Sequence, residues 1–383
     1  MSRKVVHVAL NGVTGRMGYR QHLVRSLLAI REQGGVVLPD GTTVYPEPIL
    51  VGRSGPKLRA IAERHGLERW SANLDEVLGD STVEVYFDTQ VTRARETSLA
   101  SAIEAGKHVY TEKPVAGSLE GAIRLARQAR QAGVINGVVQ DKLFLPGMIK
   151  LRSLVKDGFF GRVLSIRLEF GYWVFEGDTI AAQRPSWNYR SEDGGGIVLD
   201  MFPHWQYLLE DLFGPIAALY AKRVTHVPRR WDEAGNPYEV TADDAAYAVL
   251  EFDSGVVGSV NSSWAVRVNR RELVELHVDG THGSAVAGLR NCSVQPRACT
   301  PMPVWNPDLP DPLDYLAQWT DVPDNQVFDN GFKVQWELFL TAVATGQPFR
   351  WDLAEGAKGV QLAGLALESS AKGQRVSVPP LPL

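Results

Sequence analysis

The sequence predicts an α/β protein of two domains, the first of them built on a doubly wound parallel sheet. Three observations support this prediction. The chain has 383 residues, more than a single hydrophobic core usually organises. Its first 140 residues alternate short β-branched runs with segments of helical spacing, a pattern typical of parallel strands joined by crossover helices. A turn with three glycines follows the first of these runs directly. We place the domains at residues 1–142 and 143–383.

The strands and helices of the first domain are expected to alternate. The first strand, KVVHVAL, precedes a helix that ends near Gln33. Further strands are expected at residues 48–53, 83–89, 107–112 and 134–140, and further helices at residues 55–66, 93–106 and 118–133. Residues 34–48 interrupt the alternation. Their Pro-Asp-Gly predicts a hairpin turn in a surface elaboration to which we assign no function.

The glycine turn predicts a dinucleotide site in a Rossmann-type domain. Gly12, without a Cβ, can make the tight turn, Gly15 lets a pyrophosphate approach the backbone, and Gly18 lets the helix pack closely on the strand. The spacing G-x-x-G-x-x-G is less common than G-x-G-x-x-G, and a purely structural turn is the alternative. The residues expected to contact the cofactor here are Gly12, Thr14, Gly15, Arg16, Met17 and Gly18.

The end of the second strand, VGRS, predicts which nicotinamide cofactor is used. An NAD site usually carries an acid here that hydrogen-bonds the ribose diol. Arg53 cannot accept those bonds, but its guanidinium can pair with a 2′-phosphate, and Ser54 can add a hydrogen bond. We therefore predict a preference for NADP, with NAD as the alternative cofactor. The alternative interpretation is that Arg53 is an exposed loop residue without a function.

Several polar side chains are expected at the carboxyl ends of strands, where ligands bind in an open α/β sheet. Thr89 follows the third strand, and Glu112 and Lys113 follow the fourth, in AGKHVYTEKP. A lysine at this place can reach an oxygen of the cofactor or the substrate, although exposed lysines at strand ends are also common. Lys142 follows the fifth strand and is a candidate for the substrate site.

In the second domain, three successive glycines precede an apolar run that carries Asp200 and His204. Four residues apart, these two side chains share one face of a regular helix. Pro203 disfavours helical geometry at Phe202, so a helix that begins or kinks there would separate them. We expect the glycines to give the backbone room beside cofactor or substrate. Aromatic, amide and guanidinium groups suit sugars, and the candidates before the glycines are Trp187, Tyr189 and Arg190. The alternative interpretation of Trp187 is that it packs in the core.

Together, these motifs resemble the Gfo/Idh/MocA family of NAD(P)-dependent oxidoreductases. The resemblance rests on the glycine turn, AGKHVYTEKP and GGGIVLDMFPH, and extends over GFFGRVLSIRLEFG, DDAAYAVLEFDSGVVGSVNSSW and ELFLTAVATGQPF. It implies a catalytic set of Lys113, Asp200 and His204, and sugars, polyols or their derivatives as substrates. It also implies an α+β second domain with a large, open, mostly antiparallel sheet, often used for contacts in a homo-dimer or homo-tetramer. The bond between Lys113 and Pro114 is expected to be cis, as is frequent in the family.

Departures from the family pattern leave other functions open. The turn NGVTGRMG looks more like that of dihydrodipicolinate reductase, so reduction of an imine or a cyclic acid is one alternative. That enzyme's adjacent histidines are absent from the sequence. Where the family usually has Pro-Asn and then a histidine, the chain has Val91, Thr92 and Arg95. A non-catalytic dinucleotide sensor is the other alternative, although a sensor has no need of a proton acceptor.

Hydride transfer between a carbinol carbon and a nicotinamide requires a proton acceptor and a positive charge beside the developing alkoxide. Histidine ordinarily titrates near neutral pH, so we expect His204 to take the proton and Lys113 to stabilise the charge. Asp200 is expected to orient either partner. The reverse assignment, with Lys113 as the base, stays open.

The composition argues against several other classes of function. With 40 Lys and Arg against 44 Asp and Glu, the net charge is −4, so neither nucleic acid nor a membrane is an expected partner. Two cysteines and eight scattered histidines favour a reducing, cytoplasmic setting without a metal site. The segment 300–330, rich in proline and aromatic residues, is a lid, a subunit arm or a packed connection.

Overall fold

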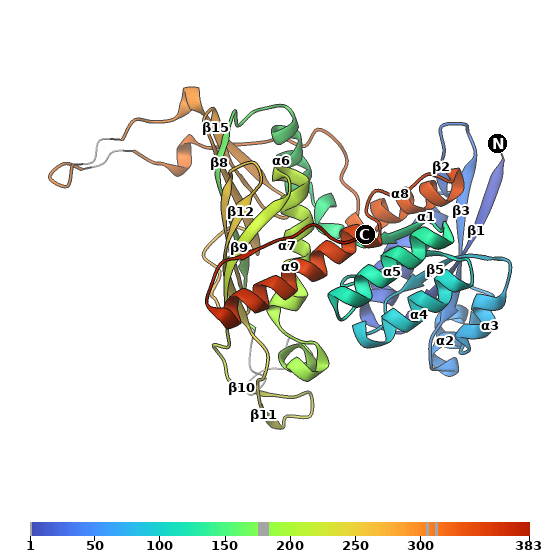
Figure 1. The fold of residues 1–383 in the computed structure, drawn as a ribbon. Helices are drawn as coiled ribbons and strands as arrows, with labels where there is room; N and C mark the ends of the chain where they lie inside the picture. The colour runs from blue at the N-terminus through green and yellow to red at the C-terminus, as the bar shows by residue number, and fades with distance from the viewer. Residues whose placement is uncertain (1, 175–183, 304–305, 311–312) are drawn as a thin grey trace. The chain divides into compact units, whose positions relative to one another are not determined.

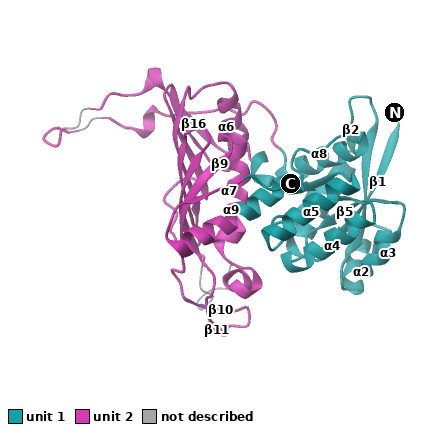
Figure 2. Ribbon diagram, in the orientation of Figure 1, with its two compact units in different colours: residues 1–144, 329–362, 380–383 teal, residues 145–328, 363–379 magenta. Residues whose placement is uncertain are grey.

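The chain forms two compact units (Figure 2). The computed structural model describes residues 2–174, 184–303, 306–310 and 313–383. Unit 1 comprises residues 1–144, 329–362 and 380–383, and unit 2 comprises residues 145–328 and 363–379. The compact units differ from the predicted domains of residues 1–142 and 143–383 at the C-terminal end, since most of the last 55 residues, 329–383, fall in unit 1.

Unit 1 is built on a seven-stranded, mainly parallel sheet (Figure 1), which confirms the predicted fold class. Its order is β2-β3-β1-β5-β6-β7, with β4 paired to β3, and β2–β3 is the antiparallel pair. The strand order reverses beside β1, so the carboxyl ends of β1 and β5 flank the crevice where such a sheet binds its ligand. The bounds are β1 (Arg3–Asn11), β2 (Val36–Val37), β3 (Thr43–Val51), β4 (Trp70–Ser71), β5 (Val83–Asp88), β6 (His108–Thr111) and β7 (Asn136–Val138).

Helices cover both faces of this sheet. Val8 and Leu10 of β1 belong to the apolar cluster that includes η1 and α8, and Ala9 belongs to the cluster of α4 and α5 on the other face. Trp336 and Phe339 of α8 are fully buried in the first cluster, which is why this late segment belongs to unit 1. The bounds are η1 (Met17–Leu28, a π-helix), α1 (Ala29–Glu32), α2 (Gly55–His65), α3 (Leu74–Gly79), α4 (Thr92–Glu104), α5 (Leu119–Ala132), η2 (Asp141–Phe144) and α8 (Gly331–Thr345).

The insertion at residues 34–48 is more than a surface elaboration. Its predicted turn is confirmed, with Leu38 N donating to Thr42 O over 2.8 Å and Gly41 at a φ of 83°. Beyond the turn, however, the chain enters β3, whose residues from Thr43 onward pair in register with β1. Val44 is fully buried in the core. The insertion therefore lengthens a central strand and adds the edge strand β2.

Unit 2 contains a nine-stranded sheet in the order β17-β16-β15-β14-β8-β13-β12-β9-β18, antiparallel apart from β13 and β8. One face packs on α6 and α7 (Figure 1), and alternate side chains of its strands, such as Leu168 and Leu250, are buried there. The other face leaves Tyr220, Tyr247 and Val249 exposed. This architecture confirms the α+β fold that the resemblance implied.

The sheet strands of unit 2 are β8 (Val163–Gly171), β9 (Ile216–Val224), β12 (Ala245–Phe252), β13 (Val257–Ser263), β14 (Val274–Gly280), β15 (Gly283–Ala287), β16 (Cys292–Pro296), β17 (Thr320–Asp321) and β18 (Val376–Ser377). A small hairpin joins β10 (Arg229–Trp231) to β11 (Pro237–Glu239). The helical segments are α6 (Pro146–Lys156), η3 (Ser186–Tyr189), η4 (Ser191–Asp193), α7 (Ile197–Phe213), η5 (Arg297–Cys299) and η6 (Leu316–Gln318). The last helix, α9 (Leu353–Lys372), begins in unit 1 and ends in unit 2.

The segment between β16 and β17 extends away from the sheet of unit 2 (Figure 1). Met302, Leu309 and Leu316 are 92 %, 64 % and 81 % exposed. A packed connection, one of three predictions for residues 300–330, is therefore wrong for the part that carries Met302, Leu309 and Leu316, whereas Thr320 and Asp321 pair with β16.

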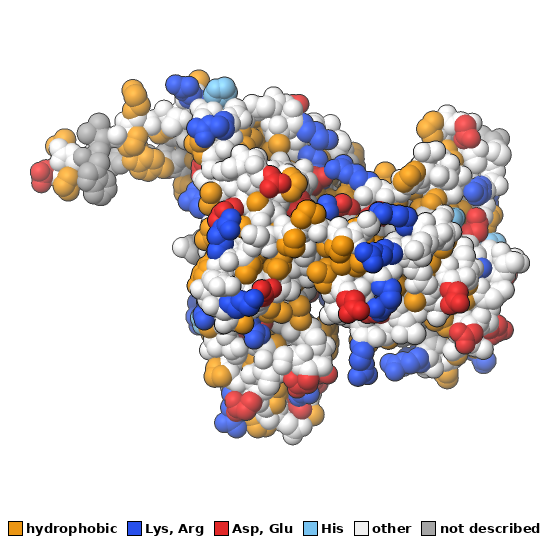
Figure 3. Space-filling model, viewed as in Figure 1, with side chains coloured by type: hydrophobic (Ala, Val, Ile, Leu, Met, Phe, Trp, Pro, Cys, Tyr) orange, Lys and Arg blue, Asp and Glu red, His pale blue; other side chains and the backbone are white. Residues whose placement is uncertain are grey.

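The surface carries charges of both signs. Lys and Arg side chains are interspersed with Asp and Glu side chains over the face drawn in Figure 3. Within the described ranges, no helix has both the length and the apolar character needed to cross a membrane.

Candidate active site

The glycine turn after β1 has two glycines that the fold requires and one that faces outward. A Cβ on Gly12, whose φ is 85°, would lie 2.9 Å from the carbonyl group of Thr89. On Gly18 it would lie 2.7 Å from Thr89 Cγ2. At Gly15 a Cβ would meet only Gly12 O, at 3.3 Å, and Gly15 is exposed together with Thr14 and Arg16. The packing of the chain therefore does not require a glycine at position 15. The exposed turn has room for a phosphate group that approaches the backbone.

Thr89 closes this turn from the end of β5. Its N–H donates to Asn11 O over 3.0 Å, and its side chain contacts the position of Gly18. The structure thus brings together Thr89 and the glycines, which the sequence singled out separately. Met17 is half-buried as the first residue of η1.

Arg53 and Ser54 lie between β3 and α2. Arg53 is exposed, and its guanidinium makes no hydrogen bond or ion pair within the part of the chain that is described. Ser54 is the N-cap of α2, but its side chain does not make the capping bond. Both groups are therefore available to an anion at the N-terminus of a helix.

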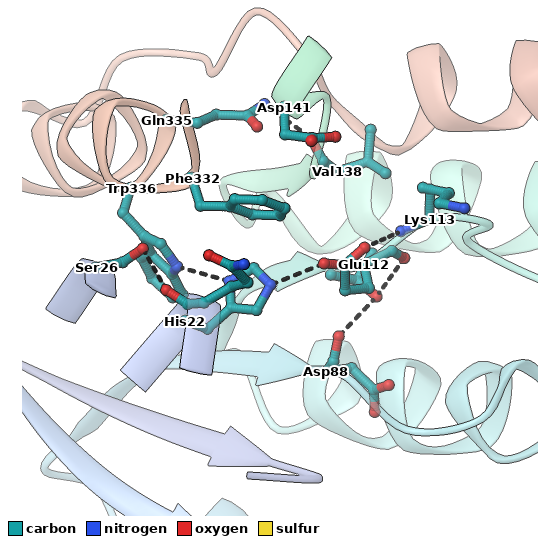
Figure 4. Close-up of polar contacts among 12 residues, drawn as sticks. His22, Ser26, Asp88, Glu112, Lys113, Val138, Asp141, Phe332, Gln335 and Trp336 are labelled. Atoms are coloured by element: carbon teal, nitrogen blue, oxygen red, sulfur yellow. Dashed lines mark hydrogen bonds and ion pairs between the residues drawn. The ribbon is translucent and has the colours of Figure 1, made fainter. Parts of the chain in front are cut away.

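The Lys113 segment begins where β6 ends, at the carboxyl edge of the sheet (Figure 4). Glu112 N donates to Asp88 O over 2.9 Å, and Glu112 Oε2 accepts from Lys113 N over 3.2 Å. The Glu112 side chain is buried, whereas Lys113 is half-buried. The Lys113–Pro114 bond is cis, as the resemblance implied.

Arg95, where the family usually has a histidine, ties the loop after β5 to the Lys113 segment. It is 4 % exposed. Its guanidinium donates to Asp88 Oδ1 over 3.2 Å, to Gln90 O over 2.6 Å and to Pro114 O. All three nitrogens are thus used within unit 1, so Arg95 holds the backbone that follows Lys113.

Helix α7 carries Asp200 and His204 without a break. It begins at Ile197, six residues before Pro203, so the expected beginning of the helix at that proline is wrong. Its N-terminus is capped by Asp243, which lies shortly before β12. Asp243 O accepts from Ile197 N over 3.0 Å, and Asp243 Oδ2 accepts from Val198 N over 2.9 Å. Burial raises the pKa of Asp243.

The glycines before α7 allow other parts of unit 2 to approach the start of the helix closely. A Cβ on Gly195 would lie 2.5 Å from Asn188 O, and a Cβ on Gly196, at a φ of 118°, would lie 2.9 Å from Asp243 Oδ1. We expected these glycines to make room for a ligand. That expectation is wrong for Gly195 and Gly196, because chain atoms of unit 2 occupy the space.

His204 and Asp200 each have a partner that orients them. His204 is 7 % exposed, and its Nδ1 lies 2.7 Å from Tyr207 Oη, one turn further along α7. Asp200 Oδ2 accepts from Arg184 Nη1 over 3.1 Å. Burial alone would lower the pKa of Arg184, but the Asp200 carboxylate and the Tyr172 hydroxyl raise it above its ordinary value.

Arg184 is a residue of the candidate site in unit 2 that sequence reasoning missed. It stands in RPSWNYR beside the chosen candidates, but nothing local indicates its partner. Its guanidinium lies 4.2 Å from the ring centroid of Trp264 and also donates to Asn188 Oδ1 over 3.1 Å. Asp200 is therefore held by a positive charge on an aromatic platform, which suits an orienting role.

The remaining candidates lie in different environments. Trp187 is 49 % exposed, so the alternative that it fills the core is wrong. Tyr189 is buried, with its ring against Trp264 and the guanidinium of Arg230. Arg190 stacks on Tyr238. In unit 1, Lys142 Nζ lies 2.6 Å from Asp141 Oδ2.

No group of three or more His, Cys, Asp or Glu side chains is placed to hold a metal ion in the described ranges. The chemistry available in unit 2 is that of an imidazole and a carboxylate on one helix. In unit 1 it is that of an ammonium group after β6 and a glycine turn after β1, both at the carboxyl edge of the sheet. These are the groups that acid–base catalysis of hydride transfer requires.

Comparison with known proteins matches both units to one family. Residues 7–140 match "Oxidoreductase family, NAD-binding Rossmann fold", and residues 148–286 match "GFO/IDH/MocA C-terminal domain". The chain is 57 % identical over 383 residues to the D-xylose dehydrogenase of Paenarthrobacter nicotinovorans, covering 99 % of both chains. It is 28 % identical over 273 residues to the 1,5-anhydro-D-fructose reductase of Ensifer adhaerens, covering 70 % of this chain and 72 % of the other.

The fold also matches solved structures. A levoglucosan dehydrogenase in complex with NADH and levoglucosan superimposes with a TM-score of 0.81 at 20 % identity. The match covers 98 % of this chain and 100 % of that chain.

Proposed function

Because the chain belongs to the Gfo/Idh/MocA family of NAD(P)-dependent oxidoreductases, we propose that it oxidises a sugar at a carbinol carbon, with D-xylose as the first substrate to test. The observation that supports this choice is the 57 % identity to a D-xylose dehydrogenase along 99 % of both chains. That relative is named a dehydrogenase of a sugar, which favours oxidation of a sugar over imine reduction and over sensing without catalysis.

The test is turnover of NADP⁺ and NAD⁺ by the purified protein against aldopentoses, aldohexoses, inositols and keto acids. We expect reduction of the cofactor with D-xylose or a closely related pyranose. Cofactor binding without turnover on any of these compounds would favour the sensor. Turnover confined to cyclic imines or acids would favour the reductase.

In the proposed mechanism, the catalytic set is the one that the family resemblance implies, namely Lys113, Asp200 and His204. A nicotinamide cofactor would be held by the glycine turn, Arg53 and Ser54, and it would supply the hydride acceptor for the carbinol carbon. His204 takes the hydroxyl proton at Nε2, while Nδ1 donates to Tyr207 and fixes the ring. Asp200, held by Arg184, orients a substrate hydroxyl or the imidazole. The Lys113 ammonium group stabilises the developing alkoxide.

The cofactor preference is proposed to be NADP. Arg53 is exposed without a partner in the described ranges, and Ser54 leaves its hydroxyl unused at the N-terminus of α2. A 2′-phosphate would be bound by both groups and by the positive end of the helix dipole. A ribose diol would find no carboxylate at this place.

Arg53→Glu is expected to shift the preference toward NAD⁺. A charged hydrogen-bonded contact contributes about 1.5–3 kcal/mol, so kcat/KM for NADP⁺ should fall by roughly tenfold to a hundredfold. Initial rates with both cofactors measure the ratio. Arg59→Glu, further along α2, changes the charge equally and should leave the ratio near that of the wild type. An unchanged ratio in Arg53→Glu would remove the argument for NADP.

We also propose a homo-oligomer formed through the open sheet face of unit 2, in a cytoplasmic setting. Tyr220 and Val249 lie side by side on β9 and β12 and are 42 % and 45 % exposed on that face. A flat sheet face with exposed aromatic and branched side chains is typical of protein contacts. Light scattering of the purified protein measures the subunit number, and a monomer would contradict this proposal.

A further inference from the structure

Three buried side chains form a hydrogen-bonded chain that ends at Lys113 (Figure 4). Trp336 Nε1 lies 3.0 Å from His22 Nδ1, and His22 Nε2 lies 2.8 Å from Glu112 Oε1. Glu112 Oε2 accepts from the backbone N–H of Lys113 over 3.2 Å. His22 and Trp336 are fully buried, and Glu112 is 7 % exposed. The three come from η1, the end of β6 and α8, so only the tertiary fold brings them together.

The direction of each hydrogen bond follows from the chemistry of the indole. An indole N–H donates and cannot accept, so Trp336 requires an unprotonated Nδ1 on His22. The proton of His22 then resides on Nε2 and is donated to Glu112. His22 is therefore neutral and held in one tautomer. Phe87 and Phe332 pack against its ring, with centroids 4.3 Å and 5.3 Å away.

Glu112 is held as a carboxylate by its surroundings. Burial opposes the charged form of Glu112, whereas the hydrogen bond from His22 and the positive charges of Lys113 and Arg95 favour it. A protonated Glu112 would have to donate one hydrogen bond where it now accepts. Both oxygens are thus used as acceptors, one from His22 and one from Lys113 N.

This chain cannot conduct a proton away from the reaction. A relay needs an acceptor at its far end, and the indole of Trp336 offers none. A role in shaping the Lys113 segment fits the contacts instead. His22 fixes Oε1 of the Glu112 carboxylate, and this also fixes Oε2. Oε2 accepts from the backbone N–H of Lys113, whose side chain is expected to contact the substrate.

We propose that Trp336 and His22 are positioning residues for Lys113: the indole N–H sets the tautomer of His22, His22 sets the Glu112 carboxylate, and that carboxylate sets the backbone at Lys113. The inference rests on the proposed catalytic role of Lys113. It gives a function to α8, whose sequence lies more than 200 residues beyond that of Lys113.

The first test is Trp336→Phe, which keeps an aromatic ring against Phe87 and Tyr110 and removes the N–H. In this variant Arg95 still binds Pro114 O. We therefore expect the backbone at Lys113 to shift slightly and to keep its overall course. We expect kcat to fall by roughly tenfold, in line with small misplacements of a reacting group. KM for sugar and cofactor should stay within about twofold of the wild type, since neither ligand is bound by Trp336 or His22 in the proposed mechanism. Trp351→Phe, in the same apolar cluster, is the matched control and should keep the wild-type kcat.

A second pair of variants separates hydrogen bonding from packing. In His22→Gln the side-chain amide can accept from Trp336 and donate to Glu112, as neutral histidine does. In His22→Leu neither bond remains. We expect kcat in His22→Leu to fall roughly tenfold to a hundredfold and to be largely restored in His22→Gln. Equal losses in the two variants would overturn the proposal, and so would a wild-type kcat in Trp336→Phe.

The third measurement needs no turnover. Nitrogen-15 spectra of the histidine side chains, with His22→Gln to identify the signals, should show a neutral ring protonated at Nε2 for His22. The same signals should change in Trp336→Phe and stay unchanged in Trp351→Phe. A ring protonated at Nδ1 in the wild type would overturn the proposal. If no sugar is oxidised, the proposed function fails, and this spectrum still decides whether the tautomer is held.

Discussion

Lys113→Met is expected to remove nearly all turnover while leaving the cofactor bound. Methionine keeps a linear side chain of similar length but cannot place a positive charge beside the substrate oxygen. Loss of one such stabilising group typically lowers kcat by about 10²–10³-fold. Steady-state kcat on the sugar identified by the substrate panel measures the loss. The dissociation constant of NADPH, from its fluorescence, should stay within about threefold of the wild type.

Lys156→Met is the matched control for this substitution. Lys156 is exposed at the end of α6, and its replacement should leave kcat and cofactor binding unchanged. Wild-type turnover in Lys113→Met would remove Lys113 from the catalytic set. A loss of cofactor binding equal to the loss of kcat would make Lys113 a cofactor ligand instead.

His204→Ala is expected to have the second large effect. The imidazole is the proposed proton acceptor, and such a group typically contributes about 10²–10⁴-fold to kcat. The side chain is buried and held by Tyr207, so its removal leaves a small space in α7. Added imidazole that enters this space should restore part of the rate in a concentration-dependent manner. Rates with and without imidazole, at several pH values, measure this.

The same variant decides which residue accepts the proton. If His204 is the acceptor, we expect kcat of the wild type to fall at acidic pH and this fall to be absent from His204→Ala. An unchanged pH profile with a lower rate would transfer the role of base to Lys113. His282→Ala, at an exposed turn in unit 2, is the control and should behave as the wild type.

Local sequence was sufficient for those parts of the fold that depend on neighbouring residues. The alternation of strands and helices over residues 4–140, the turn at Gly12 with its positive φ, and the strand-end position of Lys113 are all fixed by short-range periodicity and backbone sterics. The resemblance added the fold of the second unit. Local pattern failed at residues 34–48, where a hairpin signal obscured the start of β3.

The assignment of residues 329–362 to the second domain differs from the structure for another reason. Residues 331–345 form α8, and the local sequence of a helix does not indicate which sheet the helix covers. In the structure, Gln335 of α8 accepts from Gln140 N over 2.8 Å and donates to Val138 O over 3.1 Å. The apolar side chains of α8 complete one face of the parallel sheet.

The sequence by itself determined the kinds of groups at the site: the glycine turn, Lys113, and Asp200 and His204 four residues apart. The tertiary structure alone decided what holds them, namely Arg184 beside Asp200 and the chain from Trp336 through His22 to Glu112. The reason is physical. Helical and strand periodicity depends on residues a few positions apart. A buried hydrogen bond such as that of Trp336 to His22, in contrast, joins residues 314 positions apart. Such a pair forms only when packing has excluded water from both partners.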